Sequence, residues 1–466
     1  MTKLGSTGGG NHTPATLSDA TLTRLRALRA DGVDTLIIGA ADLNAQFRVK
    51  RFSLDLFLES DEVEIAFSDY VFAADLEENL MVPRPGYEGY FPTAAQGVPD
   101  ISVRPDWEVI RVLPWEPRTA LVLGDFFSHA GVELRVAPRT VLKRVIDRLN
   151  GMGYVPMTGA EYEFLIFKGS LSEAREHPSR LEPLSVGAAY GYTRAALDEK
   201  YLGPLRRSIV AAGVPVEAVN PESAAGQFEI TIRYDQALKT ADHAFLYKDF
   251  VKELLGRDGL TATFIAKYGQ DYGSSGHVHV SLRDAKGQPL MTDEDGGLSQ
   301  VARHAIGGYM QTMREFTAIY APTVNSYRRY NSDYAFAGNT VAWGLDNRTC
   351  GLRLIHTTAN STRLESRVAG ADMNPYLTLA ALLAGIGAGL EKGIDPPQST
   401  DGDAYVTEGV ERVPKDLRTA TELFEQSEIA RDWLGDDFVN FYVETRLWEV
   451  NEHRLSISDW ELRRYL

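Results

Sequence analysis

Two acidic side chains recur at alternate positions of a strand-like stretch. Residues 158–167 read TGAEYEFLIF, and Glu161 and Glu163 stand two positions apart among residues that favour strands. Because side chains alternate between the two faces of a strand, both carboxylates point to the same side. They repel each other there unless a cation lies between them. For this stretch alone, a solvated strand face is an equally good interpretation.

The same alternation returns in three later segments, residues 227–234 (QFEITIRY), 277–282 (HVHVSL) and 363–368 (RLESRV). Their polar faces carry acids, imidazoles, hydroxyls and guanidiniums: Gln227, Glu229, Thr231 and Arg233; His277, His279 and Ser281; Arg363, Glu365 and Arg367. The opposite faces are mostly apolar, as expected for strands that cover a core. If the four segments share one sheet, its polar face is a site for metal ions and phosphate.

Carboxylates dominate the candidate ligands, namely Glu161, Glu163, Glu222, Glu229 and Glu365. With one histidine they favour Mg²⁺ or Mn²⁺ over zinc or copper. Five carboxylates would overcharge a single ion, so we expect about two or three ions. Arginines, which bind carboxylate and phosphate bidentately, follow close together in the sequence: Arg328, Arg329, Arg348, Arg353, Arg363 and Arg367. Enzymes that transfer a phosphoryl group neutralise its charge with metal ions on one side and arginines on the other.

The elements that position these residues follow from periodicity and punctuation. We expect helices over residues 17–31, 138–151, 236–256 and 298–319, strands over 33–38, 45–50 and 119–126, and a charged helical tail after Pro396. Residues 377–390 predict a buried helix that Asn374 caps and Pro375 begins. A proline-rich stretch ends near residue 118. We therefore expect a flexible tail over 1–15, a small N-terminal domain over 16–118 and a catalytic domain over 119–466.

Composition narrows the class of protein. The chain has 466 residues, of which 44% are apolar and 24% charged, as in globular proteins. Its net charge of −16 argues against nucleic acid as a partner. We expect no signal peptide and no membrane span, and the one cysteine, Cys350, indicates a reducing compartment, so we expect a cytoplasmic protein. No Walker-type loop or GxSxG motif occurs. The glycines at 385, 387 and 389 miss the dinucleotide-binding spacing and predict close packing instead.

Six motifs in a fixed order carry a family resemblance: GAEYEF, NPESAAGQFEI, GSSGHVHVSL, NSYRRY, DNRTCGLRL and RLESRVAGADMNPYL. On these the chain resembles glutamine synthetases, and more closely the glutamine-synthetase-like γ-glutamyl-amine ligases. The resemblance is strong over residues 119–395, thin over 30–118 and weak beyond. It implies an α+β fold with a small N-terminal β-grasp domain and a large catalytic domain containing a curved antiparallel sheet. It also implies homo-oligomeric rings, usually dodecamers, with each active site between neighbouring subunits.

The implied reaction has two steps: ATP phosphorylates the γ-carboxylate of glutamate, and an amine then displaces phosphate. By the resemblance, one metal ion has the ligands Glu163, Glu222 and Glu229, and the other has Glu161, His277 and Glu365. From spacing alone, His277 and His279 are interchangeable as ligands.

The resemblance also implies roles for residues around the substrates. Arg329 and Arg367 would clamp the substrate carboxylate and the transferred phosphate, and Arg348 and Arg353 would stabilise the phosphate. Gly273 would begin the loop that packs against glutamate. The nucleotide would be held by Glu217, Tyr234, His279, Ser281 and Arg363, with Arg348 and Arg353 at its phosphates.

Two departures from the family pattern bear on the amine. The flap glutamate of ammonia-using members falls at Ala335, and the ammonium-binding aspartate falls at Ser68, or at Asp69 with a shift of one. Both changes remove features that hold ammonium, and the first opens space for carbon. We therefore predict a ligase for glutamate and an organic amine, with Asp333, Asp69 or solvent as the base. The alternatives are an ammonia-using glutamine synthetase and a catalytically silent homologue.

Overall fold

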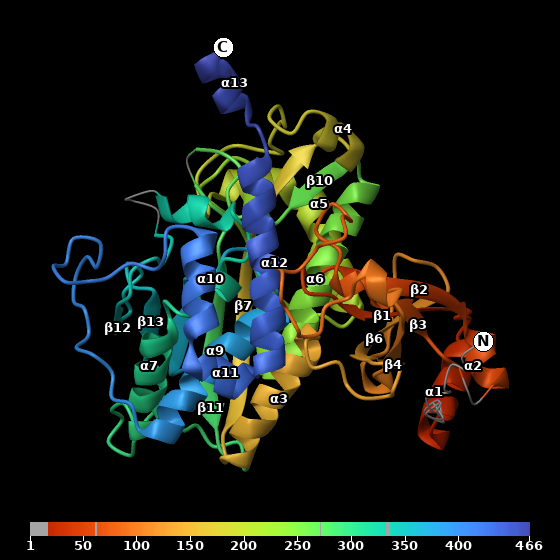
Figure 1. Cartoon of the computed structure of the whole chain (residues 1–466), viewed down its shortest axis with the longest axis horizontal. Coiled ribbons are helices and arrows are strands. Elements are labelled where there is room, and N and C mark those ends of the chain that lie inside the picture. Colours follow the sequence, from red (N-terminus) through yellow and green to blue (C-terminus); the bar gives the residue numbers. More distant parts are fainter. Residues whose placement is uncertain (1–16, 61–62, 271, 332–335) are drawn as a thin grey trace, which may run out of the picture. The chain divides into compact units, whose positions relative to one another are not determined.

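The computed structural model describes residues 17–60, 63–270, 272–331 and 336–466 (Figure 1). The chain forms two compact units, one from Met1–Leu80 and Phe91–Thr140 and the other from Met81–Tyr90 and Val141–Leu466. This division falls later than the expected boundary near residue 118, because strand β6 (Thr119–Phe127) pairs with strands of the first unit.

The first unit contains a six-stranded sheet in the order β2-β1-β6-β4-β3, with β5 added beside β6. Its strands are β1 (Thr35–Ala41), β2 (Phe47–Ser53), β3 (Ala66–Ser68), β4 (Asp100–Pro105), β5 (Arg111–Val112) and β6. Two helices, α1 (Asp19–Ala30) and α2 (Leu54–Glu59), complete it together with short 3₁₀ turns. The expected helix, hairpin and strand are confirmed here, with ends shifted by a few residues. Strands β1 and β6 run parallel, and β1 and β2 form the antiparallel hairpin.

The second unit contains an eight-stranded sheet in the order β12-β13-β14-β11-β7-β9-β8, with β10 beside β7. Its strands are β7 (Val155–Lys168), β8 (Val216–Pro221), β9 (Gln227–Gln236), β10 (Leu260–Thr263), β11 (Gly276–Arg283), β12 (Trp343–Leu345), β13 (Leu352–Ile355) and β14 (Arg363–Ser366). All neighbours are antiparallel except β12 and β13. The four segments with alternating polarity are β7, β9, β11 and β14, and they are adjacent in this sheet. The condition for a shared polar face is therefore met, and the α+β class is confirmed.

The apolar faces of these strands are buried against helix α6 (Ala237–Arg257) and the segment after β10. Tyr162 of β7 packs against Tyr247 of α6, with ring centroids 5.8 Å apart, and Phe164 stacks on Phe264 at 5.4 Å. Such aromatic burial supplies much of the driving force for one face to turn inward. The polar side chains of the same strands must then point the other way.

The remaining helices of the second unit surround this sheet, except the last one, which has no buried residue and projects away from the sheet at the C-terminus (Figure 1). They are α3 (Pro138–Gly151, which begins in the first unit), α4 (Leu171–Glu176), α5 (Tyr192–Ala211), α7 (Gln300–Thr312), α8 (Thr317–Tyr320), α9 (Pro375–Lys392), α10 (Leu417–Gln426), α11 (Glu428–Leu434), α12 (Asp436–Leu455) and α13 (Asp459–Tyr465). The single helix expected over 298–319 is two helices, α7 and α8. None of the helices in the described ranges combines the length and hydropathy that a membrane-spanning helix needs.

Helix α9 confirms the buried helix expected around residues 377–390. The Asn374 side chain accepts hydrogen bonds from the amides of Tyr376 and Leu377, Pro375 occupies the first turn, and Gly393 ends the helix with φ of 64°. Gly385 and Gly389 lie against α7: a Cβ at Gly389 would be 2.1 Å from the carbonyl oxygen of His304, and one at Gly308 of α7 would be 2.2 Å from that of Gly385. Gly387 instead faces α11, since a Cβ there would be 2.1 Å from the ring of Trp433. The glycines therefore serve close packing against two helices, as the sequence indicates.

We expect Gly389→Ala to lower the free energy of unfolding by about 1–3 kcal/mol, because the added methyl group overlaps the α7 backbone. Gly256→Ala in α6 is the matched control, since nothing lies within 4 Å of a Cβ there. That change should raise stability by about 0.5–1 kcal/mol through helix propensity. Urea unfolding of the two variants measures both effects. Equal midpoints would contradict the packing role.

Candidate active site

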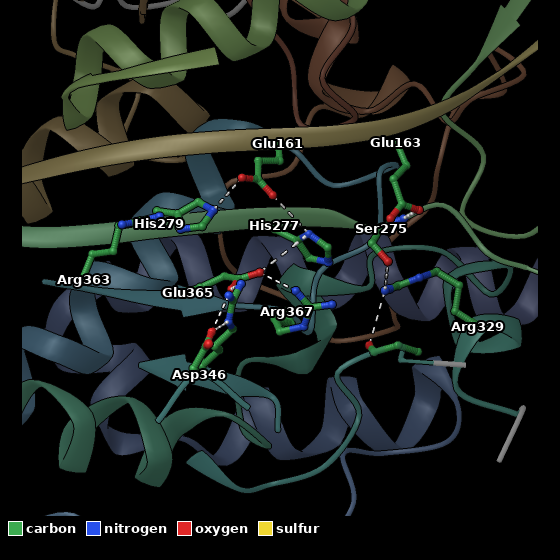
Figure 2. A network of polar contacts seen from close by, with 12 residues as sticks. Glu161, Glu163, Ser275, His277, His279, Arg329, Asp346, Arg363, Glu365 and Arg367 are labelled. Carbon is green, nitrogen blue, oxygen red and sulfur yellow. Dashed lines mark hydrogen bonds and ion pairs between the residues drawn. The ribbon is translucent and has the colours of Figure 1, made fainter. Parts of the chain in front are cut away.

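Cross-strand pairing brings the acids and histidines of the polar face together. His277 of β11 stands opposite Glu161 of β7, and His279 stands opposite Glu365 of β14. The His277 Nδ1 atom lies 3.5 Å from Glu161 Oε2 and 3.8 Å from Glu365 Oε1, while His279 Nε2 lies 3.1 Å from Glu161 Oε1 (Figure 2). Glu161 is thus within reach of both imidazoles.

Two groups of side chains have the geometry to hold an ion. Ligand atoms of Glu161, Glu229 and His277 lie within 4.8 Å of one another, and so do those of Glu161, His279 and Glu365. Four of the six expected metal ligands, Glu161, Glu229, His277 and Glu365, belong to these groups, and His277 lies near both Glu161 and Glu365 as the expected set requires. The assignment of each ligand to one ion stays a prediction. Glu161 belongs to both groups, and His279 can act as a ligand as well as His277.

Hydrogen bonds from strands β8 and β9 and from the loop before β11 hold Glu163 and Glu222. Glu163 Oε2 accepts hydrogen bonds from Gln227 Nε2 at 3.0 Å and from the Ser275 amide at 2.8 Å. Gln227 Nε2 also donates to the carbonyl oxygen of Gly273 at 2.9 Å. Glu222, just after β8, accepts from Asn220 Nδ2 at 2.9 Å. These bonds fix where each carboxylate lies before any substrate arrives.

The carboxylates differ in their protonation. Burial raises the pKa of Glu163 to about 7. Burial, followed by the charges of Glu161, Glu163 and Glu222, raises the pKa of Glu229 to about 9. Burial also acts to raise the pKa of Glu161, but hydrogen bonds and charge from His277 and His279 outweigh it and hold that pKa well below its usual range. Negative charge is therefore least compensated around Glu229.

Glu365 faces the arginines. Its carboxylate accepts from Arg367 Nη1 and from Arg353 Nη1, the latter at 2.9 Å. Burial opposes ionisation, but the charge of Arg367 and then of His277 lowers the pKa of Glu365 to about 2. Arg353 Nε also donates to Asp346 Oδ1 at 3.0 Å. Asp346 has φ of 50°, and sequence reasoning missed it, although it stands two residues before Arg348 in the DNR motif.

Arg329 and Arg348 occupy contrasting environments. Arg329 is 1% exposed, and its guanidinium donates to the Val368 carbonyl oxygen at 3.1 Å and to Ser275 Oγ at 3.0 Å. A Cβ at Gly273 would lie 2.5 Å from Arg329 Cγ, so this loop position requires glycine. Arg348 is exposed, and its charge acts on Asp346.

A cavity of about 320 Å³ adjoins this cluster. Five of the seven residues expected around the nucleotide line it, namely Glu217, Tyr234, His279, Ser281 and Arg363, whereas Arg348 and Arg353 are not among its lining residues. Glu161 lines it as well, so the cavity and both potential ion sites meet at one carboxylate. Sequence reasoning missed the loop that carries Asn360, Ser361 and Thr362, which closes one side of the cavity.

Tyr234 reaches the cavity because of a β-bulge. Simple alternation along β9 puts Tyr234 on the apolar face. In the structure the pairing of β7 with β9 shifts between Thr158 and Ala160, so that Arg233 and Tyr234 both face Gly159. One extra residue re-aims the side chains that follow it. The glycine inside the β7 strand pattern was the available signal for this bulge.

The residues expected to shape the amine site are only partly described. Ala335 and Asp333 lie outside the described residues. Ser68 and Asp69 belong to the first unit, where the Ser68 hydroxyl donates to the Val98 carbonyl oxygen at 3.1 Å. Asp69 is buried, and burial and then the charge of Asp100 raise its pKa to about 6.

Comparisons with known proteins agree with this geometry. Residues 135–465 match the model of the glutamine synthetase catalytic domain. The chain is 37% identical to gamma-glutamylethanolamide synthetase of Streptomyces coelicolor, over 94% of each chain, and 34% identical to glutamate–isopropylamine ligase of a Pseudomonas species, over 93% of this chain and 95% of the other. Glutamine synthetases are also among the relatives.

Among solved structures, the GmaS/ADP complex superposes with a TM-score of 0.80 at 27% identity, covering 95% of this chain and 98% of that one. The fold, the ordered motifs and these matches extend over most of the sequence. The chain belongs to the glutamine synthetase catalytic-domain family.

Proposed function

We propose that this protein is an ATP-dependent ligase that joins the γ-carboxylate of glutamate to an organic amine. The products are a γ-glutamyl amide, ADP and phosphate. The observation that carries the proposal is the single sheet face on which Glu161 joins two groups of potential metal ligands to a cavity large enough for part of a nucleotide. The organic-amine ligases among the relatives support the choice of the second substrate.

The cavity is the proposed site of ATP. Its walls offer an aromatic ring at Tyr234, a hydroxyl at Ser281 and a guanidinium at Arg363. Glu161 and His279 belong both to the cavity lining and to a potential ion site. The phosphates are therefore proposed to lie at the end of the cavity near Glu161 and His279, and the nucleotide's adenine base at the opposite end. The similar GmaS structure was solved with ADP, which supports a nucleotide here.

The acid cluster suits divalent cations. His277 Nε2 is buried and has no hydrogen-bond partner among the described residues. Burial and the charges of three neighbouring glutamates raise the pKa of Glu229 to about 9, against the opposing charge of Arg367. Carboxylate oxygens with one imidazole are a donor set for Mg²⁺ or Mn²⁺. We propose about two or three ions held by Glu161, Glu163, Glu222, Glu229, Glu365 and a histidine. When bound, such ions supply positive charge beside the phosphates.

The first step forms a mixed anhydride. A γ-carboxylate oxygen of glutamate attacks the γ-phosphorus of ATP, and the bond to the bridging oxygen of ADP breaks. Arg329 and Arg367 are proposed to hold the substrate carboxylate and the phosphoryl group, and Arg348 and Arg353 to stabilise the charge on the phosphoryl oxygens. Arg353 and Arg367 already converge on Glu365, so their positions are set by an internal carboxylate.

In the second step the amine nitrogen attacks the carbonyl carbon, and phosphate leaves as the C–O bond breaks. An alkylamine reaches the protein protonated, so a base must take a proton first. Ala335 provides no carboxylate at the flap position, and neither does Ser68 at the ammonium-binding position, unless a shift of one residue places Asp69 there. Both residues support a larger, carbon-bearing amine over ammonium. A ring-shaped homo-oligomer, such as a dodecamer, is the proposed assembly, with glutamate and the amine as small-molecule substrates.

Phosphate release from ATP, Mg²⁺ and glutamate should depend on which amine is added. The panel is ammonium, putrescine, spermine, ethanolamine, isopropylamine and aniline. We expect one organic amine to exceed ammonium by tenfold or more in kcat/KM, equivalent to about 1.4 kcal/mol in the transition state. Glu365→Gln serves as the inactive control for contaminating ATPases. A preference for ammonium would contradict the proposal and identify a glutamine synthetase, and no turnover with any amine would also contradict it.

Ala335→Glu should lower kcat/KM for bulky amines and raise it for ammonium, because the new carboxylate occupies space and holds a small cation. Ala335→Gln is the matched control, since it adds nearly the same volume without the charge. We expect both variants to lose activity with the bulky amines and only the Glu variant to gain activity with ammonium. An unchanged preference in both would refute the role of this position.

Metal-free protein should lose stability as the pH rises from about 6 to 9. The pKa values of Glu163 and Glu229 in the folded protein, about 7 and about 9, lie above the ordinary 4.5. In that window the folded state binds protons that the unfolded chain has released, so removing them destabilises the fold. Bound Mg²⁺ replaces these protons, and the melting-temperature difference between Mg²⁺ and EDTA should therefore grow with pH.

Glu229→Gln is the control for this titration, because a neutral amide carries no charge to neutralise. The variant's metal-free melting temperature should change less between pH values of about 6 and 9 than that of the wild type. A constant Mg²⁺ effect across this range in the wild type would show that protons and metal ions do not compete at this cluster.

A further inference from the structure

A buried guanidinium joins helix α5 to the turn that carries Glu222. Arg194, in the first turn of α5, is 4% exposed. Its Nη1 atom donates to the carbonyl oxygens of Glu222 at 2.5 Å and Gly187 at 3.2 Å. Its Nη2 atom donates to those of Gln227 at 2.8 Å and Ala224 at 3.1 Å. One side chain therefore satisfies three carbonyl groups of the turn 222–227.

The remaining donor of Arg194 is also used. Its Nε atom donates to Ser185 Oγ at 3.2 Å, and that hydroxyl donates to Asp198 Oδ2 at 2.5 Å. The guanidinium lies over the ring of Phe228, 5.1 Å from its centroid. A lysine has no planar fork and could not make these divergent bonds at once. The arrangement depends on arginine rather than on positive charge alone.

The turn held by Arg194 carries one acid of the cluster, Glu222, and one residue that holds another acid, Gln227. Glu222 begins it, and Gln227 ends it by donating from Nε2 to Glu163 Oε2 at 3.0 Å. The Glu222 amide in turn donates to the Gln227 carbonyl oxygen at 2.9 Å, which closes the turn. Movement of Arg194 would therefore reach Glu222 directly and Glu163 through Gln227.

On its other side Arg194 holds the segment 185–191, in which Tyr190 stands out. Tyr190 has φ of 56°, which is uncommon for a residue other than glycine, and its amide donates to the Pro221 carbonyl oxygen at 3.0 Å. Its side chain is 74% exposed, yet its hydroxyl interacts with Glu222 and it lies within the electrostatic reach of Glu229 and Arg348. Surrounding structure must stabilise such a backbone.

Gly187 shows how closely this segment fits the guanidinium. Its φ is 148°, a conformation that other residues rarely adopt, and a Cβ there would lie 3.4 Å from Arg194 Cδ. The segment thus passes over the aliphatic part of Arg194 and then presents Tyr190 beside Glu222. Aromatic faces and carboxylates both attract alkylammonium ions, so this juxtaposition suits a protonated organic amine.

We propose that Arg194 is a positioning residue for amine selectivity: it fixes the segment 185–191 on the turn 222–227, so that the Tyr190 ring stands beside Glu222 as a wall of the amine subsite. The inference rests on the proposed function, since it assigns a site to the second substrate of that reaction. The proposed ATP site lies elsewhere on the sheet, at the cavity that residues of β7, β9 and β11 line. Substitution of Arg194 should therefore leave the binding of ATP almost unchanged.

The test compares Arg194→Lys with Arg206→Lys, both on α5. Arg206 is the matched control because it pairs at the surface with Glu199 and does not contact the turn. For Arg194→Lys we expect the KM for the preferred amine to rise about tenfold, with the KM for ATP changed less than about twofold. The ratio of kcat/KM between bulky and small amines should also change. Arg206→Lys should resemble the wild type.

Variants of Tyr190 distinguish a specific effect on amine selectivity from a general loss of structure. Tyr190→Ala should reproduce the altered amine ratio, whereas Tyr190→Phe, which keeps the ring, should retain most of the wild-type selectivity. If Arg194→Lys fails to fold, Gly187→Ala replaces it, because a residue with a side chain is strained at a φ of 148° and the change leaves the guanidinium in place. Amide hydrogen exchange should then rise in residues 186–191 and 221–226 together, and stay unchanged in α6.

Two outcomes would overturn the inference. One is an equal loss of kcat for every amine with an unchanged selectivity ratio. The other is unchanged exchange in both segments of Arg194→Lys or Gly187→Ala. Failure of the proposed function is a separate result, which is measured on the wild type. If the wild type uses ammonium alone, the assignment of an organic amine is wrong. The KM for ammonium in Arg194→Lys then still shows whether Arg194 positions the amine subsite.

Discussion

Repulsion among buried carboxylates is the constraint on which this structure depends. Cross-strand pairing places Glu163 opposite Glu229 and Glu161 near both. Negative charges on neighbouring strands inside a protein raise its free energy unless protons, cations or hydrogen-bond donors offset them. The chain offsets them unevenly, with imidazoles at Glu161, guanidiniums at Glu365 and backbone or amide donors at Glu163. Glu229 is left as the acid with the highest pKa.

The rest of the second unit holds this arrangement in place. Aromatic packing behind β7 and β9 prevents a register slip, because moving a strand by one residue would bury the acids and expose Phe164 and Phe228. The loop from Gly273 to Ser275 is held on one side by Gln227 and on the other by Arg329. Polar residues far apart in sequence thus share hydrogen bonds that a solvated sheet face would not need.

Period-two alternation was enough to predict the polar face, since β7, β9, β11 and β14 all obey it over their central residues. It could not predict the bulge at Gly159, because pairing register is a property of two strands, and Tyr234 therefore changes face. Grouping of the acids into ion sites was also beyond sequence. Glu161 reaches both histidines only because of the side-chain directions in two neighbouring strands, β7 and β11.

Helix boundaries were predicted well where capping chemistry was explicit, as at Asn374 and at Pro138 with Gly151. They were predicted poorly where apolar periodicity ran through a break, as between α7 and α8. Arg194 carried no motif that would have marked it. Its partners are backbone carbonyl oxygens, which look the same in every sequence.

Glu161 has a further consequence because a single carboxylate belongs to both potential ion groups and to the cavity wall. Any ligand that engages it alters the charge that the others meet. Binding of a ligand at this wall of the cavity and binding of ions to the two groups are then thermodynamically linked, and the linkage must be reciprocal. In such an arrangement cooperativity between nucleotide and cation needs no moving domain, because it follows from two ligands sharing one side chain.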